Sequence, residues 1–190
     1  MKVKNIEDLG MLIALSGEVD VSMMNTLDQA VEKLLNNKEK PAKKATILLS
    51  TTGGMTWIGN AIGERIAFLS RFIDLRIIAM TMVASSGVRV FLSLPRDRRF
   101  VSPDVDIMIH QVKRGADSSS RQSLDERRKR LEEELISIEV NEREERRWVK
   151  LLAKEMGLSY KKALSLWITS HHFDAAEAVK CGLAASIILF

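Results

Sequence analysis

The sequence predicts an α/β fold in which parallel strands are joined by helices, and three observations lead to this prediction. Short apolar segments alternate with segments of helical periodicity, at the spacing typical of β–α–β units. The short segments are apolar throughout, as expected of strands with helices on both faces. A long helical pattern without Gly or Pro then fills much of the second half. Parallel strands with right-handed crossovers are therefore expected.

The first half of the chain supplies most of the expected sheet. Apolar runs predict four strands there, at residues 11–15, 45–49, 75–80 and 105–109. Apolar residues at helical spacing predict a helix that ends near Asn37 and a second helix over residues 58–69. A polar loop over residues 36–44 separates the first helix from the second strand. The serine-containing segment after residue 80 lies where a strand pattern changes into a helix pattern.

The second half is dominated by one expected helix, from Leu124 to Met156. An apolar stripe runs along it at both ends, and its members are Leu131, Leu135, Ile138, Trp148, Leu152 and Met156. Residues 141–147 between them include no apolar side chain. A helix that is polar all round cannot pack on a core. We therefore expect its middle to project into solvent or to meet a charged partner surface, and its apolar ends to pack on another subunit.

The C-terminal region predicts a short helix and a last strand. Gly157 closes the long helix, and Asp174 with Glu177 has the pattern of a capping box. The helix that this box begins is expected to end at Gly182. A final strand is expected over residues 185–190.

Composition limits the class of protein. A chain of 190 residues with 46% hydrophobic residues is the size of a single globular domain. The N-terminal residues are charged and have no apolar core of a signal peptide. The longest apolar run, over residues 77–94, contains Arg89 and is expected to be buried rather than to cross a membrane. A single cysteine, Cys181, permits no internal disulfide, so a cytoplasmic protein is expected.

Charge does not indicate nucleic-acid binding. The net charge is +4, but the basic residues between Asp125 and Lys154 are interleaved with glutamates. With six Phe and one Tyr, the chain has no basic stripe with stacking aromatics. His171 and His172 are not joined by Cys, Asp or Glu at a metal-binding spacing, so no metal and no cofactor are expected.

Three segments could together supply acyl-transfer chemistry. Ser85 lies among small residues at the start of an expected helix, His110 ends the next apolar strand, and Gly53-Gly54 ends an earlier one. A hydroxyl nucleophile needs a base to take its proton and backbone N–H groups to hold the oxyanion.

These segments resemble the proteolytic subunit of the Clp protease (ClpP) family, within the ClpP/crotonase superfamily. The family's Ser-Pro-Gly-Gly loop corresponds to residues 51–54 (Thr-Thr-Gly-Gly), and its Ala-Ser-Met-Gly motif to residues 84–87 (Ala-Ser-Ser-Gly). Its Met-Ile-His-Gln-Pro strand corresponds to residues 108–112 (Met-Ile-His-Gln-Val). Residues 175–179 and 182–183 are similar to the family's Ala-Glu-Glu-Ala-Val and Gly-Leu. The likeness covers about residues 11–112 and 157–188.

The resemblance implies a fold and a set of roles. The fold would be a ClpP/crotonase-like spiral of β–α–β units in a single domain over residues 1–190, with a head at about 1–112 and 157–190 and a projecting handle helix at about 113–156. Ser85 would be the nucleophile and His110 the general base, and the N–H groups of Gly54 and Ser86 would form the oxyanion hole. The chain would be the serine-protease subunit of an ATP-dependent protease. It would form a homo-oligomeric ring that cleaves peptides or unfolded proteins.

Departures from the family leave alternatives open. The family's triad aspartate falls on Ser170, which cannot carry a negative charge, and Asp174 is the nearest acid but is expected to cap a helix. Val112 replaces a proline, and the long helix exceeds the family's handle region. Few residues precede the first strand, so the family's N-terminal helix and axial loop are expected to be absent, which leaves docking of an AAA+ ATPase open. A non-catalytic ClpP-like structural or regulatory subunit and a crotonase-type acyl-CoA enzyme remain as alternatives.

Overall fold

The computed structural model describes residues 9–36, 44–111 and 124–189, and these form two compact units. One unit comprises Met1–Ile109 with His171–Phe190, and the other is His110–Ser170. The single-domain organisation, with a head at about 1–112 and 157–190 and a handle at about 113–156, stays a prediction. Val112 and the residues before Leu9, on which two of the departures rest, lie outside the described residues.

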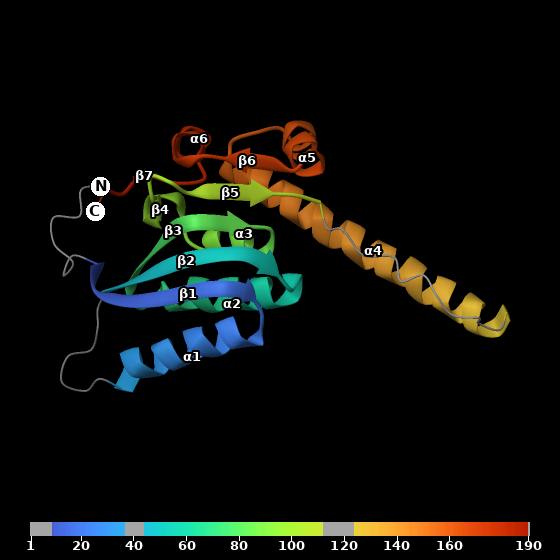
Figure 1. Ribbon diagram of the computed structural model, residues 1–190, viewed down its shortest axis with the longest axis horizontal. Helices are drawn as coiled ribbons and strands as arrows, with labels where there is room; N and C mark the ends of the chain where they lie inside the picture. Colours follow the sequence, from blue (N-terminus) through green and yellow to red (C-terminus); the bar gives the residue numbers. More distant parts are fainter. Residues whose placement is uncertain (1–8, 37–43, 112–123, 190) are drawn as a thin grey trace. The chain divides into compact units, whose positions relative to one another are not determined.

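The first unit is built on a mostly parallel sheet. Its strands β1 (Met11–Val19), β2 (Lys44–Gly54), β3 (Asp74–Ala84), β4 (Arg99–Val101) and β7 (Ser186–Ile187) follow one another in that order, all pairs being parallel. Figure 1 shows this order, with helix α1 (Val21–Asn36) beside the edge strand β1. Strand β5 (Asp106–Ile109) pairs in parallel with β3, and β6 (His171–Phe173) pairs antiparallel with β5. The predicted α/β fold with parallel strands is confirmed, and β6 is the exception.

Strand β3 changes its neighbour midway, and this change positions the serine segment. Residues 77–79 of β3 pair with β4, whereas residues 82–84 pair with β5. Between them Thr81 has a φ of 47°, and the pairing of β3 with β2 loses its register. A bulge of this kind bends a strand and turns its end. The strand therefore continues to Ala84, beyond the predicted end at residue 80.

Helix packing brings two helices close behind the sheet. Helix α2 (Thr56–Leu69) buries Ile58, Ile62 and Ile66, which confirms the predicted helical spacing. Gly59 of α2 lies against helix α3 (Ser86–Phe91), because a Cβ added there would be 3.0 Å from the Ser86 carbonyl oxygen. A side chain at this position would push the two helices apart.

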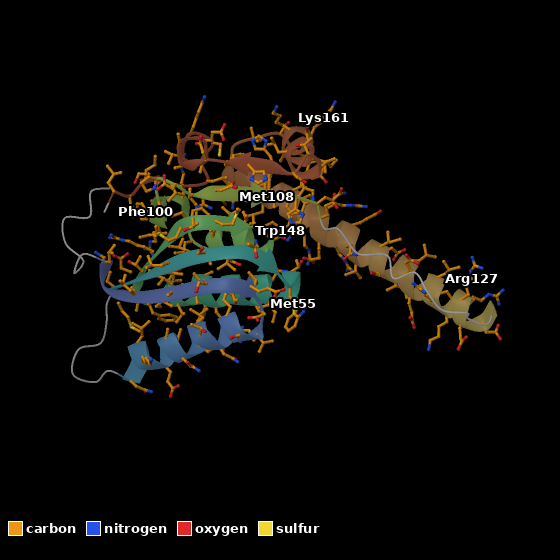
Figure 2. The ribbon with its side chains drawn as sticks, viewed as in Figure 1. Met55, Phe100, Met108, Arg127, Trp148 and Lys161 are labelled. Carbon is orange, nitrogen blue, oxygen red and sulfur yellow. The ribbon has the colours of Figure 1, made fainter. Side chains whose placement is uncertain are left out.

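The second unit consists of helices α4 (Leu124–Glu155) and α5 (Tyr160–Ile168). Trp148 of α4 stacks on Trp167 of α5, with ring centroids 5.6 Å apart, and Leu152 is fully buried. The C-terminal end of the stripe is therefore buried against α5 of the same chain, and the expectation that this end packs on another subunit is wrong. The stripe's N-terminal members Leu131 and Leu135 are 54% and 62% exposed. Side chains there, Arg127 among them, extend outward from the helix (Figure 2).

Several elements differ from the sequence-based expectation. Strands β4 and β6 and helices α5 and η2 (Arg96–Arg98) were not predicted, and the last strand is limited to Ser186–Ile187 instead of residues 185–190. Strand β1, at the sheet edge, alternates buried and exposed residues, so one of its faces is exposed and it is not apolar on both faces. Helix α6 (Ala175–Lys180) begins at the predicted capping box. Among the helices that the structure describes, none is long and apolar enough to cross a membrane.

Candidate active site

Ser85 occupies a strained turn between strand β3 and helix α3. Its backbone has φ 53° and ψ −126°, a conformation that costs a residue with a side chain about 1–3 kcal/mol. The turn is held on both sides: the Ser85 N–H donates to the Met108 carbonyl of β5 at 3.0 Å, and the Ser85 carbonyl accepts from Val88 N–H at 3.0 Å. In α/β-hydrolases, a nucleophilic serine lies on a sharp strand-to-helix turn that exposes its Oγ.

Gly53 lies directly against Ser85. A Cβ added to Gly53 would be 2.5 Å from Ser85 Cβ and 3.2 Å from Ser85 Oγ, and its φ of +100° favours glycine. The Gly53 N–H donates to Thr51 Oγ1 at 3.0 Å and is therefore engaged. The carboxyl end of β2 thus meets the carboxyl end of β3 at the serine.

Gly54 presents its N–H on the side of β2 that faces away from β1. Met55 N–H donates to the Val19 carbonyl of β1 at 2.9 Å, and Val19 is the pairing partner of Gly54. In a parallel ladder the paired residue between two bonded neighbours directs its own N–H to the opposite side of the strand. The Gly54 N–H is therefore directed toward the β3 side of the strand. Met55, which follows Gly54, and Met108 on β5 are labelled in Figure 2.

Ser86 begins helix α3 and is 3% exposed. The first N–H groups of a helix have no partner within the helix. Within the described part of the chain its buried Oγ has no hydrogen-bond partner. Ser85, Ser86 and the two glycines are thus brought together within the first unit.

His110 is the first residue after β5 and belongs to the second unit. Its Nδ1 lies 2.7 Å from the main-chain carbonyl oxygen of Gln111. The Gln111 side-chain amide donates to both carboxylate oxygens of Glu145, on α4, at 3.2 Å each. The sequence did not single out Gln111 and Glu145 as site residues. They are 34 positions apart, so only a long-range contact signal could have found them.

Ser170 and Asp174 occupy different environments. Strands β5 and β6 pair Ile109 with His171, so one further step of the antiparallel register would place Ser170 opposite His110. Ser170 has a left-handed φ of 56°. Asp174 caps helix α6, with Oδ1 accepting from Glu177 N–H at 2.8 Å. Its predicted capping role is confirmed.

The remaining titratable side chains near these strands have structural contacts. The exposed His172 ring contacts Asp106, with Nδ1 2.9 Å from Oδ2, and the half-buried His171 ring packs on Phe173. No group of three or more His, Cys, Asp or Glu is placed to hold a metal ion among residues 9–36, 44–111 and 124–189. Burial raises the pKa of the Cys181 thiol above its ordinary value.

The sequence is similar to a known protein family along most of its length. A family model described as Clp protease matches residues 7–189. The chain is 30% identical to the ATP-dependent Clp protease proteolytic subunit of Streptococcus agalactiae serotype V over 112 residues, which are 59% of this chain and 55% of that protein. This match spans about half the length of the relative. With the same subunit of Streptococcus uberis the identity is 25% over 93% of this chain and 84% of the relative.

The fold has a counterpart among solved structures. A mutant ClpP1 from Listeria monocytogenes matches with a TM-score of 0.72 at 21% identity, over 94% of this chain and 90% of that one. This match supports the ClpP-like fold, and the family model covers nearly the whole sequence. The chain therefore belongs to the Clp protease family.

Proposed function

We propose that this chain is a ClpP-like serine peptidase with Ser85 as nucleophile and His110 as general base. The observation that supports this most is the strained conformation of Ser85, held at φ 53° against the backbone of Gly53. Residues held in such conformations cluster at active sites. A serine that only packed a helix end would not need a left-handed backbone.

The proposed reaction proceeds through an acyl-enzyme. Ser85 Oγ attacks the carbonyl carbon of a peptide bond while its proton passes to Nε2 of His110. The carbonyl oxygen becomes an oxyanion, held by the N–H groups of Gly54 and Ser86. The His110 proton then goes to the leaving amine, and the C–N bond breaks. Water, deprotonated by His110, then attacks the ester carbonyl; the C–O bond to Ser85 breaks, and His110 returns the proton to Ser85 Oγ.

In this proposal no carboxylate residue takes the role of the triad acid. We assign Ser170 to the position of the family's aspartate, and the register that would set Ser170 opposite His110 supports this assignment. A hydroxyl does not stabilise the imidazolium as a carboxylate does, so turnover should be slow and should depend on the oxyanion N–H groups.

Partners are proposed from the exposed surface and from the family. Trp57 and Phe68 of α2 and Phe72 after it are 62%, 58% and 70% exposed. The rings of Phe68 and Phe72 are in contact, with centroids 5.1 Å apart, and we propose that these exposed apolar side chains belong to an interface. A homo-oligomeric ring in the cytoplasm, acting on peptides or unfolded proteins, fits these features, and an AAA+ ATPase partner stays open. Sedimentation of a monomer at micromolar concentration would contradict the ring.

A fluorophosphonate tests the proposed chemistry. The parent chain should be labelled on Ser85 alone, located by peptide mass mapping, and Ser85→Ala should not be labelled. His110→Ala should slow labelling while leaving the fold intact. Absence of labelling in the parent, under conditions in which it forms its oligomer, would contradict catalysis.

A non-catalytic structural or regulatory subunit is the rival that Ser170 favours. Such a subunit would form the same oligomer but would leave the fluorophosphonate unreacted. A crotonase-type acyl-CoA enzyme would use the paired N–H groups without a serine nucleophile, so its activity on a thioester would survive Ser85→Ala.

A further inference from the structure

The hydrogen bonds around His110 determine which ring nitrogen carries the proton. Nδ1 lies 2.7 Å from the main-chain carbonyl oxygen of Gln111. A carbonyl oxygen only accepts hydrogen bonds, so Nδ1 must donate and must carry the hydrogen. In the neutral ring the lone pair then belongs to Nε2. A general base needs this tautomer, and in the usual triad an aspartate selects it.

The carbonyl that selects the tautomer is itself held in place by helix α4. The Gln111 side-chain amide donates to Oε1 and Oε2 of Glu145, at 3.2 Å each, and both side chains are half-buried. Arg146 and Arg147, which follow Glu145, form ion pairs with Glu142 and Glu144 along the same helix. The Gln111 amide is thus hydrogen-bonded to the Glu145 carboxylate, whereas the ion pairs of these two arginines are with Glu142 and Glu144.

We infer that Glu145 and Gln111 are positioning residues that hold His110 in its Nδ1–H tautomer, in place of the orienting function of a triad acid. Glu145 fixes the Gln111 side chain, and this limits rotation of the residue whose carbonyl accepts the Nδ1 proton. The carbonyl orients the ring but brings no negative charge to it. The tautomer follows from these bonds alone, whereas its catalytic consequence rests on the proposed peptidase function.

Nitrogen NMR measures the tautomer directly and without activity. The sequence has three histidines, so ¹⁵N-histidine labelling gives few signals, and a His110→Asn spectrum identifies those of His110. Magic-angle-spinning spectra of the sedimented full chain suit an oligomer of any size, and they are recorded at about pH 8.5, above the ordinary pKa of an imidazole. A protonated Nδ1 and an unprotonated Nε2 are expected in the parent.

Variants of α4 separate the positioning role from a general effect on the helix. Glu145→Ala should convert the His110 signals to a mixture of tautomers, whereas Glu145→Gln keeps an oxygen acceptor and should retain Nδ1–H. Glu142→Ala is the matched control, because it removes an exposed ion pair with Arg146 and should leave His110 unchanged. A parent ring protonated on Nε2, or a Glu145→Ala spectrum identical to the parent's, would overturn the inference.

Kinetics test the catalytic consequence. Glu145→Ala should slow fluorophosphonate labelling and kcat for a small peptide ester by about 10-fold, as for other residues that orient a reacting group, with KM unchanged. Glu145→Gln should restore most of the rate. A parent that has the tautomer but does not react would refute the peptidase proposal and leave the positioning of His110 supported. A reactive parent with equal rates in Glu145→Ala would refute the positioning role in catalysis.

Discussion

Gly53→Ala, compared with Gly17→Ala, measures how closely the glycine loop fits the serine. The two glycines have nearly the same φ, +100° and +98°, a region that L side chains rarely adopt, so an added methyl group costs each about 1–3 kcal/mol of backbone strain. At Gly17 the new Cβ would meet nothing within 4 Å. At Gly53 it would lie 2.5 Å from Ser85 Cβ and 3.0 Å from the Ala84 carbonyl oxygen. Only the second substitution therefore changes the site.

The size of both effects follows from these distances. Carbon atoms pack at about 3.5–4.0 Å, so Ser85 or residue 53 must move by about 1 Å or more. Overpacking of this kind costs about 1–3 kcal/mol beyond the shared strain. Displacing a reacting group by about 1 Å can slow a reaction by about 10²-fold. We expect Gly53→Ala to unfold more easily than Gly17→Ala by about 1–3 kcal/mol and to lose about 10²-fold in labelling rate.

Urea denaturation at one protein concentration and the fluorophosphonate labelling rate are the two assays. Gly17→Ala should be labelled at the parent's rate despite its lower stability. If both variants lose the same stability, the contact between Gly53 and Ser85 is wrong. If Gly53→Ala is labelled as fast as Gly17→Ala, the loop does not help to position the nucleophile.

Three further outcomes are expected. Ser170→Asp should raise the rate on a small peptide ester by roughly 10- to 10³-fold, at little cost in stability because Asp tolerates a left-handed φ. Asp174→Asn keeps the cap of α6 and should change the rate little. The opposite pattern would assign the acid role to Asp174. Ser85→Gly should be more stable than Ser85→Ala by about 1 kcal/mol in the free energy of unfolding and should therefore unfold at a higher urea concentration. Equal urea midpoints would show that Ser85 is not strained. Burial raises the pKa of the Cys181 thiol above its ordinary value of 9.0, so above that pH the folded state keeps a proton that the unfolded state loses. The free energy of unfolding should therefore fall as the pH rises through and above 9.0, and Cys181→Ala should reduce this slope.

The elements that the sequence predicted have a local signal. The spacing of Ile58, Ile62 and Ile66 predicted α2 because three residues on one face are buried there together. The change from an apolar strand pattern to a helix pattern predicted that Ser85 lies at a junction. The capping box of Asp174 is likewise a local feature, since its partner Glu177 is three residues away.

The elements that were missed depend on distant partners. Strand β4 includes Arg99, which is fully buried and donates to the Gly182 carbonyl at 3.3 Å, and a charged residue does not indicate a buried strand. Strand β6 consists of His171, His172 and Phe173, and its pairing with β5 joins segments far apart in the chain. The bulge at Thr81 that redirects β3 also has no signal in an apolar run.

The candidate site likewise contains residues that the sequence predicted and residues that it did not. Ser85, Ser86 and Gly54 were predicted because each belongs to a short motif. The contact between Gln111 and Glu145 was not, because Glu145 lies in a charged stretch whose side chains look equivalent in sequence. Within residues 141–147, only the fold distinguishes the glutamate that meets Gln111 from those that pair with arginines on the same helix.

Ser170→Asp and Glu145→Ala both bear on the orientation of His110, so their effects on the rate should not be independent. In the parent, the Gln111 carbonyl accepts the Nδ1 proton, and Glu145 fixes the residue that carries it. Ser170→Asp would offer a carboxylate to the same Nδ1–H, with the negative charge that the carbonyl lacks. Once that acceptor is present, the position of the carbonyl should matter less. Glu145→Ala is expected to slow the parent by about 10-fold and should therefore change the rate of Ser170→Asp by less than about 2-fold. A double-mutant cycle of labelling rates measures this coupling. Equal losses in both backgrounds would mean that Ser170→Asp and Glu145 act on different groups, and that position 170 does not replace the orienting function of Gln111.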